Sequence, residues 1–146
     1  MINVKRLDNG AGLILPMRAT ENSAGYDLRS AEDAIIQPVE HKVIGTGFAW
    51  EIPPQHFGLV IPRSGMGVKY GMRLRNTVGV IDSDYRGEVL LCVENGGNGP
   101  LIIRKGDALA QMVICPLCSY GWVTVHEVGS LTDTERGEGR FGSTGQ

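Results

Sequence analysis

Residues 76–95 read NTVGVIDSDYRGEVLLCVEN, with two apolar runs separated by a polar segment. The runs at 76–81 and 87–93 have the length and the aliphatic content of short β-strands. The segment DSDYRG at 82–87 is rich in aspartate and ends in glycine, as turns often do. This stretch therefore predicts a β-hairpin.

Similar apolar runs lie on both sides of the predicted hairpin. They cover residues 41–52, 56–61, 100–105, 108–114 and 121–128, and proline or glycine residues separate most of them. Short strands at nearly regular spacing, with turn residues between them, are typical of an all-β barrel or sandwich. We therefore expect a jelly-roll-like distorted β-barrel. The helical candidate is a turn or two around Ser64–Tyr70.

Length and charge limit the function classes. A chain of 146 residues is long enough for one core, and we expect residues 1–130 to form the barrel. After Ser130 the apolar residues nearly vanish, so residues 131–146 are expected to form a flexible C-terminal arm. A formal charge of −2 provides no basic field for nucleic acid. Apolar runs of signal-peptide or membrane-spanning length are absent, so we expect a cytoplasmic protein without a membrane partner.

The three cysteines predict neither a disulfide framework nor a metal site. Their number is odd, and a secretory signal is not evident. The segment CPLC at 115–118 supplies one cysteine pair, whereas a structural zinc site usually needs two such pairs. Metal or redox use of these cysteines is therefore set aside.

Two polar clusters stand out in the first half of the chain. Asp27 lies in the strand-like run of SAGYDLRSAED, where its carboxylate either enters a site or faces solvent. The segment IPRSGMGVKYG at 61–71 offers a guanidinium, a hydroxyl and free backbone N–H groups at one bend. That combination suits a phosphate-binding nest without P-loop spacing, although a plain polar turn explains it equally well.

Two further polar features lie in the second half. The turn at 82–87 carries two carboxylates, an aromatic ring and an arginine, which is more than a turn requires. An ionised aspartate there can deprotonate a water held beside an electrophile. Gln111 interrupts an apolar run, and a buried glutamine without partners costs about 1–3 kcal/mol. The simpler interpretation is that Gln111 makes a structural hydrogen bond.

Five segments resemble, in their order along the chain, the five motifs of the trimeric dUTPase family. They are AGYDL, PRSGM, GVIDSDYRGE, GDALAQM and RGEGRFGSTG. The resemblance runs from about Ala24 to Gly145, which is most of the chain. Each motif alone is a weak signal, but five in this order are specific. The chain has Arg140 where many family members have glycine before the phenylalanine, and we expect Arg140 to face solvent.

The resemblance implies a homotrimer of β-jelly-roll subunits, with three active sites built between subunits. It implies Mg²⁺-dependent hydrolysis of dUTP to dUMP and pyrophosphate, by in-line attack of water at the α-phosphorus. Asp82 would activate the water, and Gln111 would position the water or the α-phosphate. Asp27 would hold waters bound to Mg²⁺, because this ion usually keeps several waters.

The same resemblance implies the residues that select the nucleoside. Asn76 and the backbone around it would hydrogen-bond the pairing edge of uracil. Ile81 would line the pocket, whose tight wall would exclude the 5-methyl group of thymine. Cytosine would leave buried polar groups unpaired, which discriminates strongly. Tyr85 would pack against the deoxyribose and exclude a 2′-hydroxyl.

The phosphate contacts implied by the resemblance fall into two groups. Arg63, Ser64 and Gly65 would contact the phosphate chain. The arm would close over the substrate, with Arg136, Ser143 and Thr144 at the γ-phosphate, Phe141 stacked on uracil and Gly142 allowing close wrapping. Closure of such an arm excludes water from the reacting groups.

Two rival functions remain open at this point. A dCTP deaminase has the same fold, but this chain is short for that family, and Asp82 and the complete tail motif suit hydrolysis better. A nucleotide-binding regulator would use the closed arm to change a surface for a partner. As a sole role, regulation fits a chain without the water-activating aspartate, and Asp82 is present.

Overall fold

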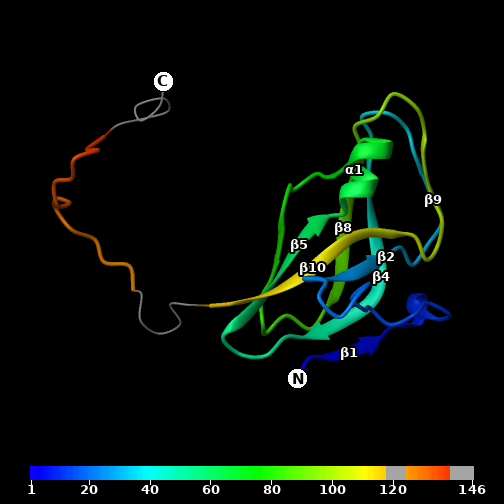
Figure 1. The fold of residues 1–146 in the computed structure, drawn as a ribbon, viewed down its shortest axis with the longest axis horizontal. Helices are drawn as coiled ribbons and strands as arrows, with labels where there is room; N and C mark the ends of the chain where they lie inside the picture. The colour runs from blue at the N-terminus through cyan, green and yellow to red at the C-terminus, as the bar shows by residue number, and fades with distance from the viewer. Residues whose placement is uncertain (118–123, 139–146) are drawn as a thin grey trace.

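The described residues fold into two four-stranded sheets, a two-stranded sheet and one short α-helix (Figure 1). This structure is a computed structural model, and it describes residues 1–117 and 124–138. The all-β class predicted from sequence is confirmed. Within the described ranges the strands form open sheets instead of one closed barrel. The same ranges hold no helix with the length and apolar character needed to span a membrane.

All paired strands are antiparallel. The first sheet has the order β1 (Asn3–Arg6), β4 (His41–Glu51), β8 (Glu88–Asn95) and β6 (Met72–Leu74). The second has the order β2 (Gly25–Arg29), β10 (Ala108–Pro116), β5 (His56–Pro62) and β7 (Gly79–Ile81). The third pairs β3 (Ala34–Ile36) with β9 (Leu101–Ile103). A 3-10 turn at Asp8–Gly10 and helix α1 (Ser64–Tyr70) complete the elements.

One hydrophobic core takes side chains from both four-stranded sheets. The alternation along β8 shows why this sequence forms a strand, because Val89, Leu91 and Val93 are buried while Leu90 is 53% exposed. A period of two places every second side chain on the same face of a sheet. The apolar residues that made β4, β8 and β10 recognisable in the sequence are therefore those that build the core.

The predicted hairpin at 76–95 is wrong in its pairing. Its two strands exist as β7 and β8, but β7 pairs with β5, with Gly58 opposite Ile81. Strand β8 pairs with β4 on one edge and with β6 on the other. A strand has only two edges that can form hydrogen bonds, and both edges of β8 are taken. The turn at 82–87 consequently leads the chain from one sheet to the other.

The predicted strand at 121–128 is not a strand in its described part. Residues 124–128 have no regular secondary structure, and every residue from 124 to 138 is exposed. Figure 1 shows this segment away from the sheets, in orange and red. A lone strand leaves its N–H and C=O groups to water and gains no cross-strand packing, so β-rich composition alone does not form one. Residues 121–123 lie outside the described ranges.

A buried asparagine ties the end of β8 to helix α1. Asn95 is 0% exposed, and its side-chain amide donates to the carbonyl oxygens of Ile36 and Gly99, both at 2.8 Å. Its side-chain oxygen accepts from the Gly97 N–H at 2.9 Å. The neighbouring Gly96 N–H donates to the carbonyl oxygen of Gly71, the residue that ends α1. The loop after β8 thus supports the helix that carries Ser64 and Gly65.

Candidate active site

A cavity of about 470 Å³ is lined by residues of α1, β2 and β10 and by Arg63, which follows β5, and we call it the α1 cavity. Five of the residues singled out from sequence line it: Asp27, Arg63, Ser64, Gly65 and Gln111. They come from three of the five motifs, so the fold brings together segments that lie far apart in the chain. Lys69 and Gly25 also line it.

Strand register explains why Asp27 and Gln111 meet. Strand β10 lies between β2 and β5, so Gln111 is opposite Asp27 on one side and Ile61 on the other. Arg63 follows β5 directly, and its N–H donates to the Leu109 carbonyl at 3.1 Å. The ladder of hydrogen bonds therefore sets the spacing of the cavity wall.

Gly25 provides the space for the Gln111 side chain. A Cβ atom placed on Gly25 would lie 2.6 Å from Gln111 Oε1 and 3.0 Å from Gln111 Cβ. Real Cβ atoms essentially never approach other heavy atoms to less than 3.0 Å. The glycine of the AGYDL segment thus allows the partly buried Gln111 side chain to line the α1 cavity.

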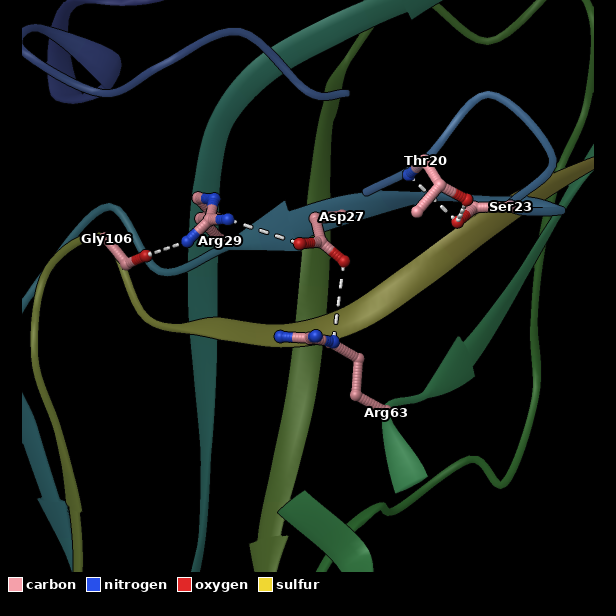
Figure 2. Close-up of polar contacts among 6 residues, drawn as sticks. All are labelled: Thr20, Ser23, Asp27, Arg29, Arg63 and Gly106. Atoms are coloured by element: carbon pink, nitrogen blue, oxygen red, sulfur yellow. Dashed lines mark hydrogen bonds and ion pairs between the residues drawn. The ribbon is translucent and has the colours of Figure 1, made fainter. Parts of the chain in front are cut away.

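Asp27 is held by two arginines (Figure 2). Its Oδ1 lies 3.4 Å from Arg63 Nε and its Oδ2 lies 3.2 Å from Arg29 Nη2, and its side chain is 13% exposed. Arg29 is itself fixed, because its Nη1 donates to the Gly106 carbonyl at 2.8 Å. The described lining of the α1 cavity contains two cationic side chains, Arg63 and Lys69, and one carboxylate, Asp27. The lining therefore carries excess positive charge, which suits a polyphosphate.

Arg29 and Lys69 were not singled out from sequence. Arg29 had a usable signal, because residues two apart on a strand share a face and Asp27 was already a candidate. Lys69 had a weaker one, since it lies in the same 61–71 segment as Arg63. Its side chain is exposed, and the structure shows no ion pair or hydrogen bond for it within the described ranges.

Ser64 and Gly65 form the first turn of α1, beside Arg63. Both residues are exposed, and a Cβ on Gly65 would meet nothing within 4 Å. The first N–H groups of any helix lack intrahelical acceptors. The Met66 and Gly67 N–H groups donate to the Arg63 carbonyl, at 3.0 and 3.2 Å. The N–H groups of Ser64 and Gly65 and the Ser64 hydroxyl are the groups that the phosphate-nest hypothesis can use.

Four further candidates, Asn76, Ile81, Asp82 and Tyr85, line two smaller cavities. The turn cavity, about 220 Å³, is lined by residues that include Ile81, Asp82 and Tyr85. The β7–β8 cavity, about 130 Å³, lies between the diverging strands and is lined in part by Asn76 and Ile81. Asn76 is exposed, and its amide donates to the Val78 carbonyl at 3.2 Å.

A single chain does not bring all predicted site residues together. Asp82 is exposed and lines the turn cavity, whereas Gln111 lines the α1 cavity. Arg136 lies in the exposed segment 124–138 and lines none of the three cavities. Phe141, Gly142, Ser143 and Thr144 lie outside the described ranges, as does Arg140.

A protein-only metal centre is not formed by residues 1–117 and 124–138, which contain no cluster of three or more histidine, cysteine or acidic side chains. Among the described residues, Asp27 is the only carboxylate that lines the α1 cavity. One carboxylate already paired with two arginines suits contact with a metal through water, with phosphates as the other ligands. It does not suit an all-protein cage.

Comparisons with known proteins agree with this fold and these motifs. The family model described as dUTPase matches residues 12–145. A deoxyuridine 5'-triphosphate nucleotidohydrolase of Clostridium kluyveri is 47% identical over 142 residues, covering 97% of this chain and 96% of the relative. The enzyme of the same name from Nautilia profundicola is 44% identical over 145 residues, covering 99% of both chains.

Solved structures give the same result. A dUTPase of Staphylococcus bacteriophage 80alpha with dUpNHpp superposes with a TM-score of 0.87 at 29% identity, covering 100% of this chain and 99% of that one. A mutant dUTPase of phage phi11, described as coordinating a structural Mg(II) ion, has a TM-score of 0.73 at 27% identity, covering 92% and 99%. Because the family model matches nearly the whole length of this chain, the chain belongs to the dUTPase family.

Proposed function

We propose that this chain hydrolyses dUTP to dUMP and pyrophosphate, by water attack at the α-phosphorus. The observation that carries the proposal is the α1 cavity, which Gln111 lines together with Arg63, Lys69 and the first turn of α1. A triphosphate carries charge that such a site neutralises, and an uncharged amide can orient a phosphate oxygen or a water. The reaction would keep uracil out of DNA and supply dUMP for dTMP synthesis.

In this proposal Asp82 is the general base. Its carboxylate is exposed at the start of the 82–87 turn, where it can accept a proton from a water. Gln111 holds the water or the α-phosphate, and Arg63, Ser64 and Gly65 bind the phosphate chain. Gln111 and Asp82 line different cavities of one chain, so a second subunit is needed to combine them.

We therefore propose a homotrimer with active sites between subunits, where the turn cavity of one subunit faces the α1 cavity of the next. Exposed apolar side chains around the turn support a covered surface there. Val80 is 60% exposed and Leu90 is 53% exposed, and both line the turn cavity. Apolar side chains gathered beside a polar site are typical of an interface.

Selection of the nucleoside is assigned to the two cavities beside β7. Asn76 and the nearby backbone bind uracil in the β7–β8 cavity, and Ile81 lines it. A cavity of about 130 Å³ is small, which supports exclusion of a 5-methyl group. Tyr85 in the turn cavity packs against the deoxyribose and excludes a 2′-hydroxyl.

Magnesium is proposed as the cofactor, with Asp27 contacting it through bound water. The ion would neutralise phosphate charge and orient the triphosphate when bound. Arg29 and Arg63 hold the Asp27 carboxylate in place, so its two oxygens are oriented before substrate arrives. The Asp27 side chain is 13% exposed and lines the cavity.

The arm is proposed as a separate functional part. Residues 1–130 form the dUTPase domain, and residues 131–146 close over the substrate. Complete exposure of residues 131–138 supports this division, because such a segment needs a ligand or a neighbour to order it. Arg136, Ser143 and Thr144 would bind the γ-phosphate, Phe141 would stack on uracil, and Gly142 would permit close wrapping.

The test is pyrophosphate release with Mg²⁺, measured in parallel on dUTP, dCTP, dTTP and UTP. Rapid turnover of dUTP alone is expected. Saturable dUTP binding without turnover would replace the enzyme with a nucleotide-binding regulator. Ammonia release from dCTP in the same samples would support a deaminase.

A further inference from the structure

The Tyr85 ring lies against Gly87 at the end of the 82–87 turn. A Cβ atom on Gly87 would lie 2.6 Å from Tyr85 Cζ and 3.0 Å from Tyr85 Cε2, and nearer still to the hydroxyl oxygen. The observed ring position and any side chain at residue 87 therefore exclude each other. Gly87 is not among the residues with a positive φ, so its backbone is one that other amino acids adopt. The ring, and not the backbone, requires glycine at this position.

Hydrogen bonds hold the ring on the glycine. The Tyr85 hydroxyl donates to the Glu88 carbonyl at 3.0 Å. Glu88 is itself anchored, because its Oε1 accepts from the Gly47 N–H at 2.7 Å and from Asn9 Nδ2 at 2.8 Å. The acceptor for the tyrosine is thus attached to the framework of the first sheet.

The turn itself is also braced. The Tyr85 N–H donates to the Asp82 carbonyl at 3.2 Å. Arg86 Nη1 donates to the Ser83 carbonyl at 2.7 Å and to the Tyr85 carbonyl at 3.0 Å. Both the backbone and the ring of Tyr85 are consequently fixed in the free protein.

This bracing does not serve the core. Tyr85 is 42% exposed and is not a member of the hydrophobic core, and it lines the turn cavity together with Asp82 and Ile81. An aromatic ring that is fixed but exposed presents a preformed surface to a ligand. Fixing it in advance lowers the ordering cost on binding and makes the surface hard to displace.

We propose that Gly87 is a specificity-determining position, which sets the Tyr85 ring where it separates deoxyribonucleotides from ribonucleotides. This inference rests on the proposed function, in which Tyr85 excludes the 2′-hydroxyl. Glycine at residue 87 leaves room for the hydroxyl end of the Tyr85 ring. A methyl group there displaces the ring from the Glu88 carbonyl, so the wall that meets the sugar moves.

The test compares Gly87→Ala with a matched control, Gly99→Ala. A Cβ on Gly99 would meet nothing within 4 Å, and Gly99 also has no positive φ, so the control has the same chemical change without the contact. The measurement is kcat/KM for dUTP and UTP under one set of conditions. Gly87→Ala is expected to lower the dUTP to UTP ratio about tenfold or more, and Gly99→Ala to leave it unchanged.

A double-mutant cycle separates ring positioning from a general structural effect. In a Tyr85→Ala background no ring remains to displace, so Gly87→Ala should then leave the ratio unaltered. An equal fall in both backgrounds would overturn the inference, as would an unchanged ratio for Gly87→Ala alone. If Tyr85→Ala itself leaves the ratio unchanged, the proposed sugar role of Tyr85 fails instead.

Two readouts cover a poorly folded or inactive protein. Tyr85→Phe keeps the ring and loses the hydroxyl bond to Glu88, so it should lower the dUTP to UTP ratio of kcat/KM by a smaller factor than Gly87→Ala. An unchanged ratio would show that the hydroxyl bond does not hold the ring, and would overturn the inference that the Glu88 carbonyl anchors it. In the unsubstituted protein, a nuclear Overhauser effect between the Gly87 Hα and Tyr85 ring protons is expected. Its absence would overturn the ring placement whatever the activity.

Discussion

Asn95→Ala tests how the loop after β8 supports the site. Asn95 is fully buried, and its side chain makes three hydrogen bonds, to the carbonyl oxygens of Ile36 and Gly99 and to the N–H of Gly97. A net contribution of about 1 kcal/mol per bond gives a loss of about 3 kcal/mol. Backbone groups left without partners in a partly buried loop can raise this loss further.

The measurement is urea unfolding of parent and variant at one protein concentration, because any oligomer would make stability depend on concentration. Asn98→Ala is the matched control, since Asn98 is exposed in the same loop and makes no hydrogen bond within the described ranges. Its free energy of unfolding should stay within about 0.5 kcal/mol of the parent.

The same substitution should also weaken substrate binding. Gly96 in this loop donates to the carbonyl of Gly71, which ends α1, so loss of Asn95 loosens the helix that begins with Ser64 and Gly65. We expect KM for dUTP to rise while the Asn98→Ala enzyme keeps the parent value. Equal stability of the two variants would refute the reasoning, because it would mean that the buried amide carries no net stabilisation.

Three further predictions concern the proposed site. Asp82→Asn should retain binding of dUpNHpp and lose about 10²- to 10⁴-fold in kcat; unchanged turnover would remove Asp82 as the base. Truncation after Glu135 should leave the oligomeric state, measured by light scattering, unchanged and lower kcat by on the order of 10²-fold. Surviving activity would exclude a closing role for the arm. Lys69→Met should raise KM for dUTP up to about fivefold at low salt, with Lys5→Met as a control outside the α1 cavity. Equal effects of the two substitutions on KM would argue against a local contact between Lys69 and phosphate.

Much of the fold could be predicted from local sequence. Strands β4, β5, β8 and β10 appeared close to their predicted ranges, and α1 formed at Ser64–Tyr70. These segments carry a clear period of two or clear turn residues at their ends, and such signals do not depend on distant contacts. Strand β3 has only three residues and β1 reads NVKR, so neither carries enough apolar alternation to be recognised.

Local sequence also identified part of the candidate site. Asp27 and Gln111 were singled out because they interrupt strand-like runs, and Arg63 because it lies in a polar bend. All three line the α1 cavity. Arg29 was missed, although it approaches Asp27 to 3.2 Å. The sequence shows that Arg29 lies two residues from Asp27 and so shares its strand face. It does not show that the Gly106 carbonyl, 77 residues further along the chain, holds the Arg29 guanidinium in place.

The sequence by itself determined the all-β class, the family and the residue types available for the chemistry. Only the tertiary structure decided that β7 joins β5 instead of β8, that residues 124–128 of a β-rich segment form no strand, and that Asp82 and Gln111 line different cavities. The physical reason is that strand pairing depends on which edges remain free after the other strands have paired. The alternation of apolar and polar side chains is a property of each strand's own sequence, whereas the pairing partner of a strand depends on all the strands together.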